Sequence, residues 1–113
     1  MAKDKLKIIF MGTPDFALPL LETSIDAGQV IAVITRPDRR GGRKRQIIMP
    51  PVKMLAMKRN LKIYQPQNVS HPEVLKIIEA LKPELIIVAA YGGILKSELL
   101  KLPPLGCCSE NIF

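Results

Sequence analysis

Four short runs of apolar residues are spaced along the chain, and each predicts a β-strand. They cover residues 7–11, 30–34, 62–64 and 85–90. Three of the runs are continuously apolar rather than alternating, which is typical of strands buried on both faces of a parallel sheet. The pattern therefore predicts a parallel sheet that is covered on both sides.

Segments with helical periodicity lie between these strands. The clearest one extends from Ser70 to Lys82, and Ser70 and Glu73 form a capping box at its start. An earlier one begins at Thr13, a good N-cap residue, and extends to Gly28. A proline within this earlier segment is awkward, because it lacks the amide donor that a helix interior needs.

Two further helices are expected over residues 52–59 and 97–102. Asn60 is the expected left-handed stop of the first, and a proline pair closes the second. Strands and helices thus alternate, which predicts an α/β fold: an open, mostly parallel sheet with helices on both faces and right-handed crossovers. We expect the sheet to stop at its fourth strand and to leave an apolar edge uncovered.

Composition narrows the class of protein. The 113 residues fit one domain, and 48% apolar residues are enough for a packed core. A net charge of +7 favours an acidic partner such as nucleic acid or an anionic membrane, although it could equally reflect a general compositional habit. The two cysteines, Cys107 and Cys108, are adjacent and have neither disulfide nor zinc-ligand spacing. Without an apolar run of about 18 residues or a signal peptide, we expect a cytoplasmic protein with no membrane span and no metal.

Ligands of open α/β sheets bind outside the carboxyl ends of the strands, so the segments that follow the strands are the candidate sites. The segment after the first strand, residues 11–16, contains one glycine and lacks the others of a dinucleotide-binding fingerprint. Asp15 would also place a negative charge where a phosphate would have to lie. We therefore expect a tight turn and a helix cap here rather than a nucleotide site.

The segment after the second strand is the most unusual one. It extends from Thr35 to Pro50, whereas such connections usually have about 2–6 residues. Its basic residues are Arg36, Arg39, Arg40, Arg43, Lys44 and Arg45. Guanidinium groups bind phosphates in a bidentate manner, and a flexible loop can follow an irregular RNA surface. We interpret the segment as an RNA-binding loop, with an ordinary solvated loop as the alternative.

The segment after the fourth strand comprises Tyr91, Gly92, Gly93, Ile94 and Leu95. Two glycines would let a flat ring lie close to the backbone, with the aliphatic side chains as an apolar wall. A plain turn into the next helix is equally compatible with these residue types.

Candidate catalytic groups are few. The only histidine, His71, falls in a helical first turn far from the ligand edge, so a surface position is expected. Asp15, Asp38 and Glu98 could titrate, but none has a partner that the sequence reveals. No nucleophilic triad can be assembled from these groups.

Three of these segments together resemble methionyl-tRNA formyltransferases. They are residues 8–17 (IIFMGTPDFA), the basic loop through residues 36–53, and residues 88–95 (VAAYGGIL). Pro19 also lies where many members carry proline. The resemblance covers residues 6 to about 107, and three segments in order at the right spacing make it specific.

The resemblance implies a Rossmann-like domain and a specific reaction. Such enzymes transfer the formyl group of 10-formyltetrahydrofolate to the amino group of methionine on initiator tRNA. It implies that the region from Tyr91 to Leu95 lines the folate pocket. It also implies that the basic loop, with its residues from Arg36 to Arg45, contacts the acceptor end of the tRNA.

The chain departs from the family pattern at its end. We expect residues 1–107 to correspond to the N-terminal part of the formyl transferase domain, residues 108–113 to be an aberrant tail, and the family's C-terminal β-barrel to be absent. Asn111 echoes the family's Asn-x-His pair, but Phe113 stands where the histidine would be. We therefore assign no catalytic residue and expect the chain to bind but not to catalyse.

Three alternatives stay open: a formyltransferase of the same fold that acts on a sugar nucleotide or on glycinamide ribonucleotide, a non-enzymatic RNA-binding or regulatory fragment, and a decayed gene product. The tRNA assignment requires the basic residues between Thr35 and Pro50 to project from the edge of the sheet that accepts the folate.

Overall fold

The computed structural model describes residues 6–41, 46–69, 71–91 and 107–110. The strands are β1 (Lys7–Gly12), β2 (Gln29–Ile34), β3 (Arg39–Gly41), β4 (Gln46–Ile48), β5 (Ile63–Tyr64), β6 (Leu85–Ala89) and β7 (Cys107–Glu110). The helices are α1 (Leu18–Ala27), α2 (Pro51–Lys58) and α3 (Pro72–Leu81), and a short 3-10 helix, η2 (Asp15–Ala17), precedes α1.

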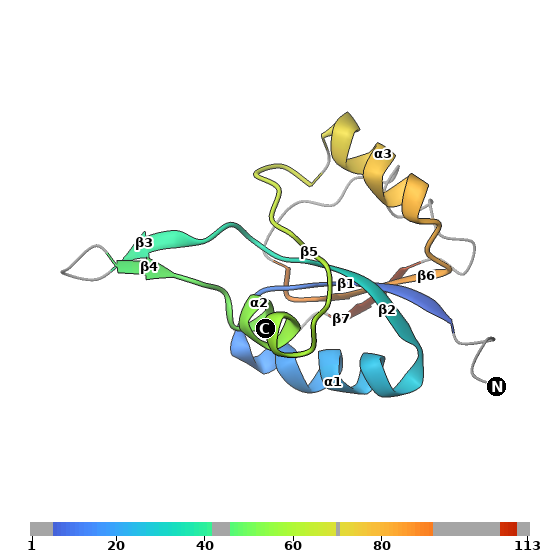
Figure 1. Cartoon of the computed structure of the whole chain (residues 1–113), viewed down its shortest axis with the longest axis horizontal. Coiled ribbons are helices and arrows are strands. Elements are labelled where there is room, and N and C mark those ends of the chain that lie inside the picture. The colour runs from blue at the N-terminus through green and yellow to red at the C-terminus, as the bar shows by residue number, and fades with distance from the viewer. Residues whose placement is uncertain (1–5, 42–45, 70, 92–106, 111–113) are drawn as a thin grey trace.

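Five strands form one parallel sheet in the order β5-β2-β1-β6-β7. Helix α3 covers one face, and α1 and α2 cover the other (Figure 1). The first strand lies at the centre, where Phe10 pairs with Val33 on one side and with Ile87 on the other. The expected α/β class and all four predicted strands are confirmed.

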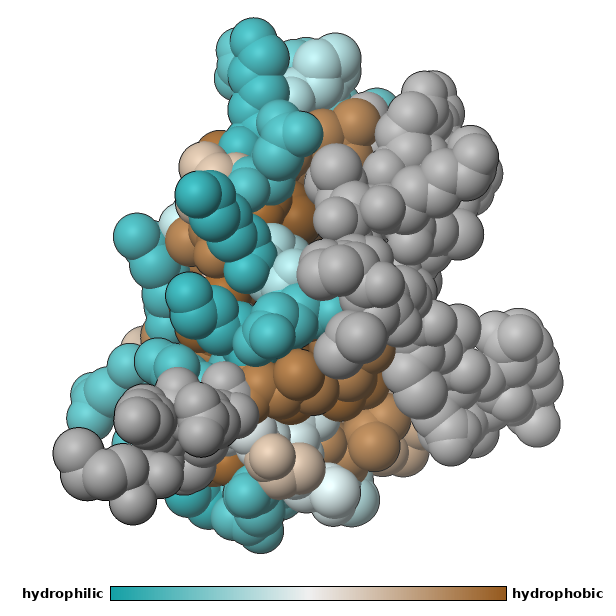
Figure 2. Space-filling model, turned by 90° about the vertical axis from the view of Figure 1, so that its right-hand side faces the viewer, coloured by the Kyte–Doolittle hydropathy of each residue, from teal (hydrophilic) through white to brown (hydrophobic). Residues whose placement is uncertain are grey.

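Each face of the sheet has its own apolar core. On the α3 side, Ile9, Ile78 and Ile86 are fully buried, and on the α1 and α2 side Phe10 and Leu21 are fully buried. Neighbouring residues of β1 thus point to opposite cores, as the pleat of a strand requires. Seen from the end opposite to β3 and β4, patches of apolar surface lie between hydrophilic side chains (Figure 2).

The start of α1 differs from the expectation. The cap of η2 is Pro14 and the N-cap of α1 is Ala17, so the prediction of Thr13 as the helix cap was wrong. The hydroxyl of Thr13 instead donates to the carbonyl oxygen of Tyr91 at 2.7 Å. Pro19 lies in the first turn of α1, where amides have no intrahelical partner, so its missing donor costs little.

The boundaries of the other two helices lie close to the predicted ones. The N-cap of α3 is His71, whose Nδ1 accepts a bond from the amide of Glu73 at 3.2 Å, so the prediction of Ser70 as the cap was wrong by one position. After α2, Asn60 has the predicted left-handed conformation, with φ 57°. The helix expected at residues 97–102 lies outside the described residues.

Two expectations about strands need correction. The basic segment is not a loop throughout, because two parts of it, β3 and β4, pair as an antiparallel ribbon. The sheet does not stop at its fourth strand either, because β7 pairs in parallel with β6 and spans the expected boundary at residue 107. None of the described helices has the length and apolar character needed to cross a membrane.

Candidate nucleic-acid and cofactor site

A cleft of about 600 Å³ lies beyond the carboxyl ends of β1 and β2. Three chain segments form most of its wall: residues 13–15 after β1, residues 36–39 after β2, and residues 48–51 between β4 and α2. Gln67 adds a side chain from the connection that follows β5. The cleft therefore lies at the edge of the sheet where ligands of open α/β folds bind.

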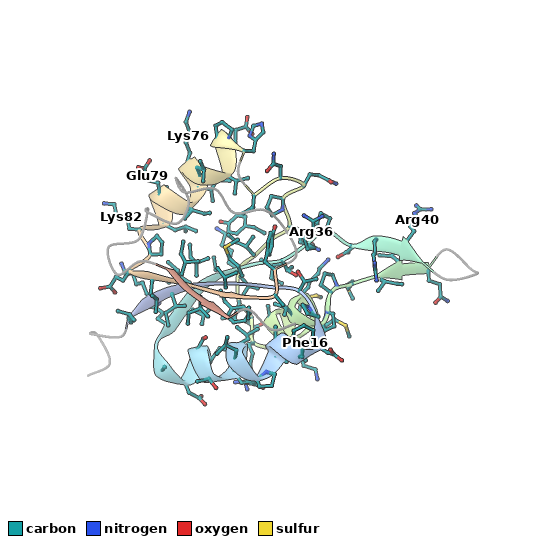
Figure 3. The ribbon with its side chains drawn as sticks, turned by 180° about the vertical axis from the view of Figure 1, so that it is seen from behind. Phe16, Arg36, Arg40, Lys76, Glu79 and Lys82 are labelled. Carbon is teal, nitrogen blue, oxygen red and sulfur yellow. The ribbon has the colours of Figure 1, made fainter. Side chains whose placement is uncertain are left out.

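The β3–β4 ribbon projects from this edge and has two different faces (Figure 1). Arg39 pairs with Ile48 and Arg40 pairs with Ile47, and residues that are paired across an antiparallel ladder share a face. Arg39 and Ile48 line the cleft. Arg40 and Ile47 belong to the opposite face, where Ile47 is 64% exposed and Arg40 points away from the ribbon (Figure 3).

A cluster of three polar side chains, Asp38, Lys53 and Gln65, holds the base of the ribbon, and we call it the polar node. Lys53 on α2 donates from Nζ to both carboxylate oxygens of Asp38, at 2.8 and 3.0 Å. Gln65 donates from Nε2 to Asp38 at 2.6 Å and to the carbonyl oxygen of Arg36 at 3.1 Å. The hydrogen bond from Lys53 and then that from Gln65 lower the pKa of the Asp38 carboxyl; desolvation opposes them, and the positive charge of Lys53 adds a smaller lowering effect.

Tyr91 follows β6 at the same edge of the sheet. Its side chain is buried in the α3-side core, and its hydroxyl has no hydrogen-bond partner among the residues that the structure describes. Burial raises the pKa of this hydroxyl, and the positive charge and the hydrogen-bonding capacity of the nearby Arg36 guanidinium act in the opposite direction. The guanidinium carbon of Arg36 lies 6.0 Å from the centre of the Tyr91 ring. The first residue of the basic segment and the first residue of the predicted folate segment are therefore neighbours.

The sequence pattern of the formyl transferase family matches residues 6–109. The chain belongs to this family. It is 52% identical over 107 residues to a methionyl-tRNA formyltransferase of Desulforamulus reducens, an alignment that covers 94% of this chain and 34% of that protein. Methionyl-tRNA formyltransferases of Trichlorobacter lovleyi and Ruminiclostridium cellulolyticum are 50% and 48% identical, over 93% and 94% of this chain and 34% of each relative. The chain thus spans about a third of the length of the curated relatives it matches.

The structure describes part of each predicted site of this formyl transferase chain. Arg36, Arg39, Arg40 and Tyr91 are described and lie at the same edge of the sheet or on the ribbon that leaves it. Outside the described residues lie Arg43, Lys44, Arg45, Gly92, Gly93, Ile94, Leu95 and Glu98. Arg36 differs from the two ribbon arginines because its side chain is half-buried against the body of the protein.

Of the other candidate residues, one lines the cleft and one lies away from it. Asp15 lines the cleft, so the turn after β1 contributes to the site although we expected only a turn and a cap. His71 is exposed and caps α3, as expected for a surface histidine. Among the described residues, no three His, Cys, Asp or Glu side chains are close enough together to hold a metal ion.

Sequence reasoning missed the roles of Thr13, Lys53 and Gln65. Each of them binds a partner that is distant in sequence, at separations of 78, 15 and 27 residues. The only local signal was the unusual length of the segment after β2, because a long projecting segment needs contacts that attach its ends to the body. The identity of the partners depends on the sheet order and could not be read from the neighbouring residues.

Proposed function

We propose that this chain provides the folate- and tRNA-binding edge of a methionyl-tRNA formyltransferase. The reaction transfers the formyl group of 10-formyltetrahydrofolate to the amino group of methionine on initiator tRNA, in the cytoplasm. The contact between Arg36 and Tyr91, 6.0 Å from guanidinium carbon to ring centre, carries the proposal. It supports a common edge for the cationic segment and the folate segment, and a group transfer needs its two reactants at one place.

On the folate side, the proposed pocket comprises Tyr91, Gly92, Gly93, Ile94 and Leu95. The hydroxyl of Tyr91 fits such a pocket, because it is buried and has no hydrogen-bond partner within bonding distance among the described residues, which makes it a candidate hydrogen-bonding group for a ligand. The Tyr91 ring packs in the core, so its part is to form the floor of the pocket rather than to stack on an open ring. The bound folate would supply the formyl group.

On the tRNA side, the proposed contacts are Arg36, Arg39, Arg40, Arg43, Lys44 and Arg45. A two-stranded ribbon that projects from the body can reach along an acceptor stem while the body stays at its end. Arg39 on the cleft face would contact the terminal nucleotides, and Arg40 on the outer face would contact backbone phosphates. Such phosphate contacts release counterions, so binding should weaken steeply with salt.

The test measures binding of the 113-residue chain to a minihelix that copies the acceptor stem of initiator tRNA. Fluorescence anisotropy gives the affinity at several salt concentrations. We expect Arg40→Ala to weaken binding several-fold and to reduce the slope of log K against log salt by about 1. Lys76→Ala is the matched control, because Lys76 also is an exposed cation but lies on the outer face of α3, away from the ribbon (Figure 3). This control should bind almost as the parent chain does.

The folate arm of the test uses a stable formyl-folate analogue and the melting temperature of the chain. Saturating analogue should raise the melting temperature, because a ligand that binds only the folded state stabilises it. Salt-sensitive RNA binding with no shift by the analogue would favour the non-enzymatic RNA-binding alternative. Equal losses in Arg40→Ala and Lys76→Ala would contradict the ribbon as the RNA contact.

A further inference from the structure

The ribbon has few means of keeping its direction relative to the body. Within the part of the chain that the structure describes, strands β3 and β4 pair only with each other, in a two-stranded sheet of their own. The outer side chains of the ribbon, such as Ile47, are exposed rather than packed against the body. An isolated hairpin of this kind is marginally stable in water, so contacts at its base must set its orientation.

Asp38 is the residue immediately before β3, and it connects three parts of the chain. Its carboxylate accepts hydrogen bonds from Lys53 on α2 and from Gln65 after β5. The same amide of Gln65 also holds the carbonyl oxygen of Arg36, two residues earlier on the path to the ribbon. The strand that enters the ribbon is therefore held at two successive points, by side chains from two different elements.

We propose that Asp38 is a positioning residue that fixes the ribbon over the cleft, so that Arg39 and Ile48 face the cleft and Arg40 faces outward. The inference rests on the proposed function, in which acceptor RNA approaches along the ribbon. Asp38 itself is not a phosphate contact in this arrangement, because its carboxylate carries a negative charge and accepts its hydrogen bonds from Lys53 and Gln65.

The chemistry of the node requires a carboxylate. Both partners are donors, an ammonium group and an amide NH₂, and an ionised carboxylate is an acceptor on both oxygens. An asparagine would offer one acceptor oxygen and turn an NH₂ toward a donor. The side chains of Lys53 and Asp38 are only 18% and 29% exposed, so water replaces the lost contacts incompletely.

The sign of the effect on RNA affinity separates this role from plain electrostatics. Asp38→Asn removes one negative charge near the site and makes the chain more cationic. Simple attraction between cations and phosphates then predicts tighter RNA binding. A ribbon released from its base predicts weaker binding instead, because its arginines no longer meet the phosphates together.

The experiment compares three chains: the parent, Asp38→Asn and Glu22→Gln. Glu22 is the matched control, since it is a carboxylate that pairs with Arg59, the residue that caps the end of α2, outside the cleft lining. We expect Asp38→Asn to bind the minihelix about three- to tenfold more weakly, with a shallower salt slope, as for the loss of one or two phosphate contacts. Glu22→Gln should bind as tightly as the parent or slightly more tightly.

Hydrogen exchange gives a second readout that needs no RNA. Amides of β3 and β4 should exchange faster in Asp38→Asn than in the parent, while the amides of β1 and β6 stay protected to the same degree. Gln65→Leu changes no charge and removes two bonds of the node, so it should show both effects even where Asp38→Asn folds poorly.

Unchanged ribbon exchange in both variants, or RNA binding by Asp38→Asn at least as tight as that of the parent, would overturn the positioning role. A parent chain that does not bind the minihelix would overturn the proposed function instead. In that case the exchange of β3 and β4 alone decides whether Asp38 holds the ribbon.

Discussion

The sheet body and the β3–β4 ribbon are both built from β-strands, but different forces hold them in place. In the body, strands such as β1 and β6 are apolar, have a neighbour on each side and are covered by helices. In the ribbon, each strand has one partner, its side chains are charged or exposed, and it is attached to the body through a polar node at Asp38. Burial therefore fixes the body, whereas a few hydrogen bonds fix the ribbon, which leaves the ribbon's side chains free for a charged partner.

The largest expected difference in free energy of unfolding comes from truncating an isoleucine to alanine in each of the two regions. Ile86→Ala removes a fully buried side chain from β6 and leaves a cavity in the α3-side core, which should cost about 2–5 kcal/mol in free energy of unfolding. Ile47→Ala removes a ribbon side chain that is 64% exposed and should change stability by no more than about 0.5 kcal/mol. Chemical denaturation of both variants measures the contrast. Similar losses in the two would show that the ribbon is packed as the body is.

A smaller difference in stability between the body and the ribbon is expected when a methyl group is added at a glycine. A Cβ at Gly12 would lie 2.9 Å from the carbonyl oxygen of Ala89 and 2.8 Å from the Phe10 ring, so Gly12→Ala should cost about 1–3 kcal/mol. At Gly41 the clash is with Cδ1 of Ile48, the mobile end of an exposed side chain that can turn away. Gly41→Ala should therefore be nearly neutral in thermal unfolding. A larger loss at Gly41 than at Gly12 would contradict the comparison.

The hydrogen bond that links the ends of β1 and β6 should contribute less to the free energy of unfolding than the side chain of Ile86 or the close packing at Gly12. Thr13→Val removes the 2.7 Å hydrogen bond from the hydroxyl to the Tyr91 carbonyl, at a cost of about 1 kcal/mol. Thr23→Val is the control, because its hydroxyl bonds the carbonyl of Pro19 on the exposed face of α1, where water replaces it. Denaturation midpoints that shift equally for both variants would rule out a specific role for the Thr13 bond.

The smallest effect concerns the titration of Asp38 at the ribbon base. Because the pKa of this carboxyl is lower in the folded chain, the node stabilises the fold above the unfolded pKa of about 3.9 and loses this contribution as the pH falls below it. Lys53→Met should raise the pKa of Asp38, as followed by carboxyl NMR. Lys58→Met, on the exposed end of the same helix, should leave it unchanged. An unaltered Asp38 titration in Lys53→Met would show that Lys53 is not its partner in solution.

The body could be predicted from the sequence because its determinants are local. Short apolar runs predicted the positions of β1, β2, β5 and β6, and periodic apolar residues together with local start and stop signals predicted all three described helices. The ribbon could not be predicted in the same way, since Arg39–Gly41 is short, charged and lacks an apolar face. Its pairing with Gln46–Ile48 depends on backbone bonds that residue types do not reveal.

The candidate site was predicted in its location and only partly in its contacts. The rule that ligands bind at carboxyl ends pointed to the segments after β2 and β6, and the cleft does border the first of them. The errors at Thr13 and Ser70 have one cause: a capping preference is a local property, and a neighbouring group can replace it. Tyr91 offers a carbonyl to Thr13, and the His71 imidazole occupies the cap position of α3.

The central position of β1 has a consequence for how the chain is made. One edge of β1 pairs with β2, but the other pairs with β6, whose first residue, Leu85, is synthesised long after Ile8. At about 5–20 residues per second, ribosomes leave this edge without its partner for several seconds. During that interval a nascent apolar strand is open to pairing with other chains. The sequence separation between the two paired strands and the rate of translation set this delay, so it lengthens whenever translation slows and no point mutation in β1 can abolish it.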